Sequence, residues 1–105
     1  MSCIFCNIIE QKKKTKAIYE DDLILAIKDI KPLYKTHILV MPKKHIRDLY
    51  CLDSKDCLIM GHLIFHLSKI ARTVDLMTGF NIKVNVGKPN GQVVEHLHFH
   101  LTSNT

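Results

Sequence analysis

The sequence predicts an α+β domain, with an antiparallel sheet of about five strands, one short helix and one long helix. Two observations predict this class. Apolar side chains between residues 57 and 74 recur every three or four positions, as on one face of an amphipathic helix, whereas the other apolar segments are short and strand-like. A chain of 105 residues, 47% of them hydrophobic, suffices for one core, so we expect a single domain over residues 1–105.

The N-terminal half predicts one short helix and three strands. Residues 4–9 suit a short helix, and residues 17–20 and 23–27 suit a β-hairpin joined by a tight acidic turn. A third strand over residues 37–41 ends at Pro42, which cannot donate a ladder hydrogen bond.

The C-terminal half predicts the long helix and further strands. Asp53 or Ser54 can cap the helix at its start, and Gly79 supplies its stop. Residues 80–86 alternate as a strand does, and residues 87–91 form a loop by composition. We expect the buried face of the helix to carry Met60, Ile64, Leu67, Ala71 and Val74.

Charge and hydropathy narrow the class of protein. The net charge is +5, which suits phosphate-bearing ligands, but the lysine-rich residues 12–16 read as a solvated loop rather than a nucleic-acid patch. No apolar run approaches the roughly 20 residues of a membrane span, and the first ten residues become polar too early for a signal peptide. We therefore expect a cytoplasmic protein with no membrane partner and no specific nucleic-acid partner.

Three histidines at alternating positions are the most informative motif. In an extended strand over residues 96–101, His96, His98 and His100 point to one face, and the apolar residues between them point to the other. Besides a plain solvent-facing stripe, three roles stay open: metal ligation, phosphate recognition, or nucleophile and proton chemistry near neutral pH. A neutral imidazole is a good nucleophile at phosphorus, and the central His98 is its natural candidate.

Cysteines and a second pair of histidines offer separate candidates for metal binding. Cys3 and Cys6 form a C-x-x-C motif, which suits a metal or redox pair, the alternative being two reduced core cysteines. His62 and His66 are four residues apart on the long helix, a spacing that can hold a metal. They lie off the predicted apolar face, so we expect them on an exposed or interface face instead.

Five blocks of the sequence together form a family pattern. They are residues 91–101 (GQVVEHLHFHL), 3–9, 19–22, 26–30 and 37–46. These blocks resemble the histidine triad superfamily, most closely its branch of histidine triad nucleotide-binding proteins. Their spacing fits without gaps, so the resemblance covers nearly the whole chain and implies the fold of that superfamily.

The resemblance implies a hydrolase of purine nucleoside phosphoramidates and related nucleotidyl esters. His98 would attack the α-phosphorus and form a nucleotidyl-histidine intermediate, which water then cleaves. The backbone carbonyl of His96 would orient the His98 ring, and His37 and His100 would lie against the phosphate. This chemistry requires no cofactor.

The same resemblance implies a binding site for a purine nucleotide such as AMP or GMP. Asp29 would hold the ribose hydroxyls, although from the residues alone it can equally be a turn residue. The apolar slot for the base would be formed by Phe5, Ile8, Ile27 and Ile30. The phosphate end would be lined by Asn85, Gly91, Gln92 and Val93. Without the resemblance, the four apolar residues would be read as core, and Asn85 as the partner of a neighbouring loop.

A structural zinc ion and a homodimer are also implied by the resemblance. Cys3 and Cys6 would bind zinc together with His45 and His96, so that two thiolates and two imidazoles close a tetrahedral site. His96 can ligate through its ring while its backbone carbonyl orients His98. The homodimer would form through the long helix and the edge strand.

Val93 departs from the family pattern. Many relatives carry a hydroxyl or acidic residue there, which can hydrogen-bond the leaving group, and valine cannot donate. An alternative function therefore stays open, a nucleotide-binding regulatory module with weak or vestigial catalysis. A zinc protein without nucleotide chemistry is a third possibility.

Overall fold

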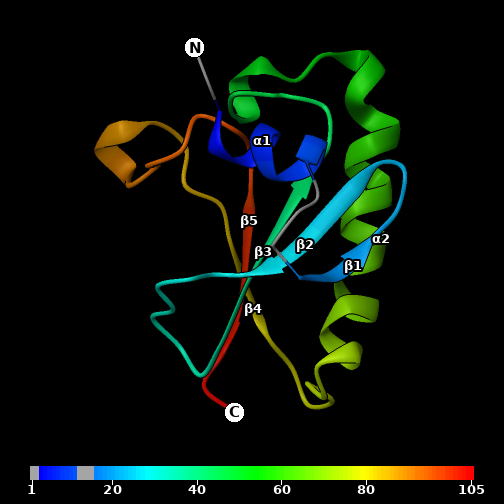
Figure 1. Ribbon diagram of the computed structural model, residues 1–105, viewed down its shortest axis with the longest axis vertical. Coiled ribbons are helices and arrows are strands. Elements are labelled where there is room, and N and C mark those ends of the chain that lie inside the picture. Colours follow the sequence, from blue (N-terminus) through cyan, green and yellow to red (C-terminus); the bar gives the residue numbers. More distant parts are fainter. Residues whose placement is uncertain (1–2, 12–15) are drawn as a thin grey trace.

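The computed structural model describes residues 3–11 and 16–105, so most of the predicted lysine loop lies outside the described residues. The predicted α+β class is confirmed, with a five-stranded antiparallel sheet, one short helix and one long helix (Figure 1). The elements are α1 (Ile4–Gln11), β1 (Ala17–Glu20), β2 (Ile24–Lys28), β3 (Thr36–Pro42), η1 (Leu49–Cys51), η2 (Ser54–Asp56), α2 (Cys57–Thr73), β4 (Asn81–Lys83), η3 (Lys88–Asn90) and β5 (Phe99–Ser103). None of the described helices is long and apolar enough to cross a membrane.

β3 lies at the centre of the sheet, whose strand order is β1-β2-β3-β5-β4. Its residues 38–41 form a continuous buried apolar run, as expected for a strand that is covered on both faces. The antiparallel register places Leu39 opposite His100 and Val40 opposite Phe99. His37, the histidine of β3, therefore lies next to the histidines near the end of the chain.

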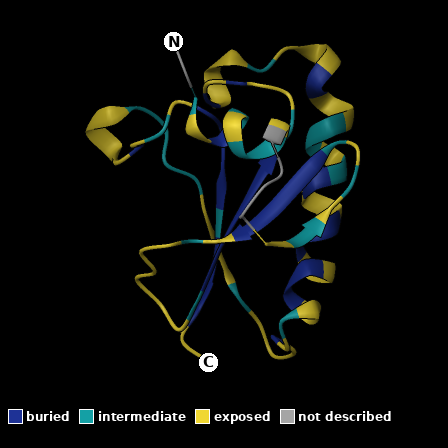
Figure 2. Cartoon of the chain, in the orientation of Figure 1, coloured by how far each residue is buried: buried dark blue, intermediate teal, exposed yellow. Residues whose placement is uncertain are grey.

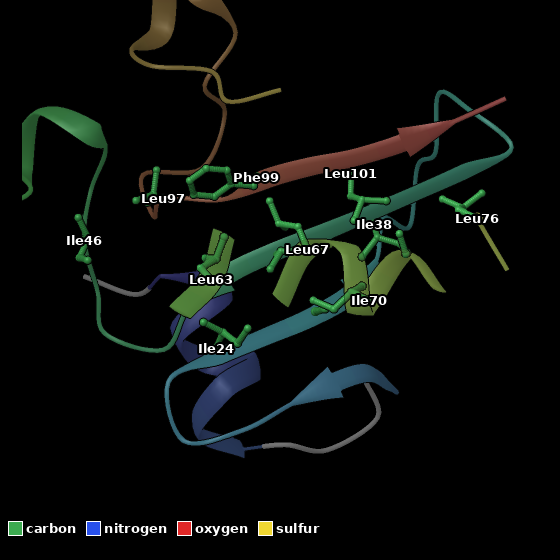
Figure 3. Packing of buried hydrophobic residues seen from close by; sticks show 13 residues of the cluster. Ile24, Ile38, Ile46, Leu63, Leu67, Ile70, Leu76, Leu97, Phe99 and Leu101 are labelled. Atoms are coloured by element: carbon green, nitrogen blue, oxygen red, sulfur yellow. The ribbon is translucent and has the colours of Figure 1, made fainter. Parts of the chain in front are cut away.

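Alternating side chains send two different apolar sets to the two faces of the sheet. Leu25 and Leu39 pack under α1 against Phe5, whereas Ile24 and Ile38 pack under α2. Figure 3 shows the α2 side of this core, with side chains of the helix meeting those of the strands. The two central strands are accordingly buried, and the loops at the ends of the sheet are exposed (Figure 2).

The predicted cap, Asp53, lies one short turn before the long helix, and α2 itself begins after Asp56, whose side chain does not cap it. The carboxylate of Asp53 accepts a hydrogen bond from the Lys55 backbone N–H at 2.8 Å, and Asp56 accepts one from the Asp53 N–H at 3.1 Å. This reciprocal pair forms the capping box of η2, which leads directly into α2. The Lys44 ammonium also pairs with Asp56 at 2.6 Å and so ties the helix start to the end of β3.

The predicted helix stop at Gly79 is wrong, because α2 ends at Thr73. Asp75 adopts the left-handed conformation with φ 66°, and the Leu76 N–H donates to the carbonyl of Ala71 at 2.9 Å. This is a Schellman ending with aspartate where glycine is usual. Leu76 is buried in the α2-side core, and its burial favours the early turn of the chain.

The predicted buried face of α2 is also partly wrong. Ile64 is 53% exposed, whereas Leu63, His66 and Ile70 are buried. Apolar residues recur at helical spacing on more than one face of this helix, so periodicity alone does not select the face that meets the sheet.

The final strands are shorter than predicted. β4 covers residues 81–83, and β5 begins at Phe99, so His96 and His98 precede the strand. The Leu97 N–H donates to the backbone carbonyl of Ile46 at 2.6 Å, which draws this segment away from the ladder. Alternation persists nevertheless, because Leu97 and Phe99 both enter the α2-side core.

Candidate active site

His98 is held in one tautomer by the backbone. Its Nδ1 lies 2.7 Å from the carbonyl oxygen of His96. Because a carbonyl can only accept, Nδ1 must carry the proton, and Nε2 presents a free lone pair. Burial lowers the pKa of His98, so the ring is neutral at pH 7. The side chain is thus oriented and protonated as a nitrogen nucleophile requires.

His37 and His100 form a hydrogen-bond relay beside His98. The Leu33 N–H donates to Nδ1 of His37 at 3.1 Å, which leaves the His37 proton on Nε2. This nitrogen lies 2.9 Å from Nδ1 of His100 and donates to it. The remaining proton of His100 is therefore on Nε2, where it can be donated to a substrate oxygen.

Burial, together with the neighbouring His98 and His37, lowers the pKa of His100 to about 4. His100 is consequently uncharged at neutral pH and acts through an oriented N–H group rather than through a positive charge.

Asp29 lies beside the relay, near the nitrogen of His37 that donates to His100. One carboxylate oxygen accepts the Lys31 N–H at 2.9 Å, as a turn residue would, and the other lies 3.4 Å from Nε2 of His37. The interpretation of Asp29 as a turn residue is therefore confirmed, and its contact with the ribose hydroxyls stays a prediction. A cavity of about 410 Å³ lies beside Asp29 and His37 and is also lined by Lys28 and Lys35.

The residues assigned to the base differ in exposure. Phe5 and Ile27 are buried in the α1-side core, which fits the core alternative, and the Phe5 ring meets the His98 ring edge-on at 5.1 Å between centroids. Ile8 is half-buried against that core. Ile30 is 90% exposed and has apolar surface that a ligand could cover.

The loop before the histidines is braced by side-chain amides. Asn85 donates to the carbonyl of Asn90 at 2.7 Å, and its Nδ2 would lie 2.9 Å from a Cβ at Gly91, whose φ is +94°. Gln92 is buried, accepts from the Gly87 N–H and donates to the carbonyl of Arg47. The side chains of Asn85 and Gln92, together with Gly91, therefore shape the loop.

Val93 follows this braced loop and is 87% exposed.

Cys3, Cys6, His45 and His96 come together as predicted for a metal site, with their ligand atoms within 4.8 Å of one another. Nδ1 of His96 lies 3.2 Å from Nδ1 of His45 and 3.4 Å from Sγ of Cys3. In a tetrahedral site with metal–ligand bonds of about 2.0 to 2.3 Å, ligand atoms are about 3.3 to 3.8 Å apart. The four side chains therefore fit a metal ion of this kind.

The ring of His96 is also prepared for ligation. Its Nε2 donates to the backbone carbonyl of Pro42 at 2.8 Å, so Nδ1 carries the lone pair that faces the two cysteines. Burial and the neighbouring Cys3 thiol raise the pKa of Cys6 to about 11, and a bound cation reverses such a shift. The ring of His96 thus belongs to the group of candidate metal ligands, and its backbone carbonyl accepts the hydrogen bond from His98.

Comparisons with known proteins agree with this geometry. The family model for the HIT domain matches residues 10–105. The chain belongs to the HIT family. An uncharacterised HIT-like protein of Synechococcus elongatus is 39% identical over 98 residues, which cover 93% of this chain and 86% of that protein.

Solved structures of HIT proteins share the fold. A HIT family hydrolase from Legionella pneumophila superposes with a TM-score of 0.92 at 32% identity, covering 99% of this chain and 94% of that one. A histidine triad nucleotide-binding protein from Candida albicans superposes with a TM-score of 0.83 at 30% identity, covering 95% and 73%.

Several groups that orient the site of this HIT protein are backbone atoms that the sequence could not reveal. The Leu33 N–H sets the tautomer of His37, the Pro42 carbonyl sets that of His96, and the Arg47 carbonyl holds Gln92. No residue type signals such a role, because every residue except proline offers the same two backbone groups. For the carbonyl of Pro42, the sequence indicated only that this residue ends a predicted strand.

Proposed function

We propose that this HIT protein hydrolyses purine nucleoside phosphoramidates and related nucleotidyl esters through an intermediate on His98. The observation that carries the proposal is the 2.7 Å hydrogen bond from Nδ1 of His98 to the His96 carbonyl, which leaves Nε2 unprotonated in a buried site. Similarity to the Legionella hydrolase and to the Candida nucleotide-binding protein supports the same class and the nucleotide-binding branch.

The first step exchanges one bond at phosphorus. The lone pair of His98 Nε2 forms a nitrogen–phosphorus bond, the bond from phosphorus to the leaving amine breaks, and the amine leaves with a proton from solvent. The modified ring bears a positive charge, which the His96 carbonyl oxygen stabilises. Water then attacks phosphorus, releases the nucleoside monophosphate and restores His98.

The neighbouring side chains bind and orient the nucleotide in this proposal. His100 donates its Nε2–H to a phosphoryl oxygen, a proton position that the relay from His37 determines. Asp29 accepts from the ribose hydroxyls, and the exposed surface of Ile30, with Ile8, covers one face of the base of AMP or GMP. The loop that Asn85, Gly91 and Gln92 shape forms the phosphate end of the site in this proposal.

An alternative function is a nucleotide-binding module with weak catalysis. The observation that favours it is Val93, whose exposed side chain offers no proton to a departing amine. The two functions predict the same nucleotide affinity and different turnover.

Activity toward a fluorogenic adenosine phosphoramidate tests the choice. Wild-type protein should release the amine and, on rapid quenching, should gain the mass of one adenylyl group. His98→Ala should show neither, and His98→Gly should recover amine release when free imidazole is added. Binding of AMP without release above the His98→Ala background would establish the regulatory module instead.

We also propose that the cluster of Cys3, Cys6, His45 and His96 holds a structural zinc ion. When bound, the ion joins the start of α1 to the segment that carries His98, and the hydrolysis needs no chemistry from it. Elemental analysis should find one zinc fewer per chain in Cys3→Ser/Cys6→Ser than in the wild type. The same zinc content in both proteins would refute the assignment.

A homodimer through α2 and the edge strand β4 completes the proposal. Leu58 and Phe65 on α2 are 78% and 74% exposed, an apolar surface that a second copy could cover. Light scattering should give twice the chain mass for the wild type and one chain mass for Phe65→Glu; a monomeric wild type would exclude the dimer.

We further infer a single HIT domain located in the cytoplasm, where free cysteines stay reduced.

A further inference from the structure

We propose a second divalent-metal site formed by Asp21, His62 and His66, which links the β1–β2 turn to α2. A carboxylate oxygen of Asp21 and a ring nitrogen from each histidine all lie within 4.8 Å of one another. This cluster lies beneath α2, whereas His37, His98 and His100 lie on the sheet face that α1 covers. The site is therefore separate from the proposed catalysis and from the cysteine cluster.

Asp21 is held in place by the turn that it forms. Its Oδ1 accepts the backbone N–H groups of Leu23 at 2.8 Å and Ile24 at 2.9 Å. Its Oδ2 lies 2.6 Å from Nε2 of His62 on α2. The same oxygen accepts a hydrogen bond from the hydroxyl of Tyr19 on β1 at 2.7 Å. Such hydrogen bonds to a carboxylate are typical of the groups that orient metal ligands.

His66 is oriented for ligation by its own helix. Its Nδ1 donates to the His62 carbonyl at 2.8 Å, which leaves the lone pair on Nε2. The ring is buried, lies 4.1 Å from the ring of His62 between centroids, and packs against Tyr19 at 5.3 Å. The sequence placed these histidines on an exposed or interface face, and the structure instead directs them to Asp21.

Two imidazoles and one carboxylate are the ligand set of open metal sites that bind zinc and other divalent transition metals. A tetrahedral zinc ion with bonds of about 2.1 Å requires ligand atoms about 3.4 Å apart, so His62 must withdraw by about 0.8 Å from Asp21. Its side chain is 28% exposed and can make this shift. The metal takes the place of the proton on Nε2 of His62 that Asp21 accepts, and the neutral ring then carries its proton on Nδ1.

Zinc titration in Cys3→Ser/Cys6→Ser tests the site without the cysteine cluster. Calorimetry should show one Zn²⁺ bound per chain. Adding His62→Gln, which keeps a donor for Asp21 but removes the imidazole, should weaken this binding at least tenfold. Adding His100→Gln instead should leave it unchanged, which controls for the third cluster of Asp29, His37 and His100.

Nuclear magnetic resonance of histidine ring nitrogens in the wild-type protein gives a readout that does not depend on the cysteine variant folding. The first equivalent of Zn²⁺ should shift the rings of His45 and His96, and the second should shift those of His62 and His66. Loss of binding with His100→Gln rather than His62→Gln would overturn the proposal. So would a second equivalent that leaves the rings of His62 and His66 unshifted.

Discussion

The two faces of the central strands differ in the work that they do. Under α2, the buried residues Ile38 and Val40 of β3 and Phe99 and Leu101 of β5 are apolar and belong to the larger buried cluster. Under α1, the same strands alternate apolar residues with His37 and His100, and His98 lies directly before β5. One face excludes water to hold the fold together, and the other holds polar rings at defined positions.

The difference shows how a small domain separates stability from chemistry. Because neighbouring residues of a strand point to opposite faces, His37 and Ile38 are adjacent in the chain yet belong to different environments. Burial on the histidine face is supported by hydrogen bonds, and among the described residues no buried side-chain polar atom is left without a partner. Substitutions on the two faces should therefore change different properties.

The largest expected effect is on the histidine face. His98→Ala should lower the rate of phosphoramidate cleavage by on the order of a thousandfold or more, because the nucleophile is removed. Its free energy of unfolding should fall by only about 1 kcal/mol, the contribution of one hydrogen bond. Urea unfolding and single-turnover kinetics on the same sample measure both. A loss of stability in His98→Ala as large as that of a core truncation would contradict the separation of stability and chemistry between the two faces.

Leu63→Ala should give the opposite result on the α2 face. Leu63 is fully buried in the apolar cluster, so the truncation should lower the free energy of unfolding by about 2–5 kcal/mol. The turnover of the folded fraction at low temperature should stay within about twofold of the wild type. If turnover falls while the urea midpoint stays unchanged, the α2 face takes part in catalysis.

Acid should destabilise the protein through the histidine face. The pKa of His100 is lowered to about 4 in the folded state, against about 6.5 in the unfolded chain. Between these values the unfolded chain binds more protons, so stability is complete above pH 6.5 and is lost as pH falls toward 4. Urea unfolding at pH 7 and pH 5 should show a smaller loss for His100→Gln than for the wild type. Equal losses would assign the acid sensitivity to other groups.

The smallest expected effect is at Val93. Val93→Ser places a hydroxyl on an exposed position next to the proposed leaving group. One hydrogen bond contributes about 1 kcal/mol, so cleavage of an amine leaving group should accelerate about fivefold. Stability should change by less than about 0.5 kcal/mol, as for other surface substitutions. Val93→Ala is the matched control and should leave the rate unchanged; an equal acceleration in both variants would argue for an effect of side-chain size.

Local patterns made much of the fold predictable. The shared face of the three histidines follows from strand alternation, and it survives although β5 begins only at Phe99. The cap at Asp53 was predictable because a carboxylate before a helix binds the nearest free N–H groups. The end of α2 was not, because Asp75 adopts a conformation that usually selects glycine, and the burial of Leu76 favours it.

The candidate site depended more strongly on family resemblance and on contacts between distant residues. The pattern C-x-x-C indicates a metal pair, but only the fold brings Cys3 and Cys6 to His45 and His96. Likewise, Asp21 lies 41 residues from His62, and nothing in either segment signals the other. The face of α2 that meets the sheet could not be chosen from its periodicity, which hid the burial of His66.

The sequence by itself determined which side chains share a face and which residue types can attack phosphorus or bind a metal, because alternation and ligand chemistry are local properties. The tertiary structure decided the tautomers of two further rings, because the Leu33 N–H and the Pro42 carbonyl select those of His37 and His96. The hydrogen bond to the His96 carbonyl, which the family resemblance implied, selects that of His98. Such backbone groups are the same in nearly every residue, so only their positions in space make them specific.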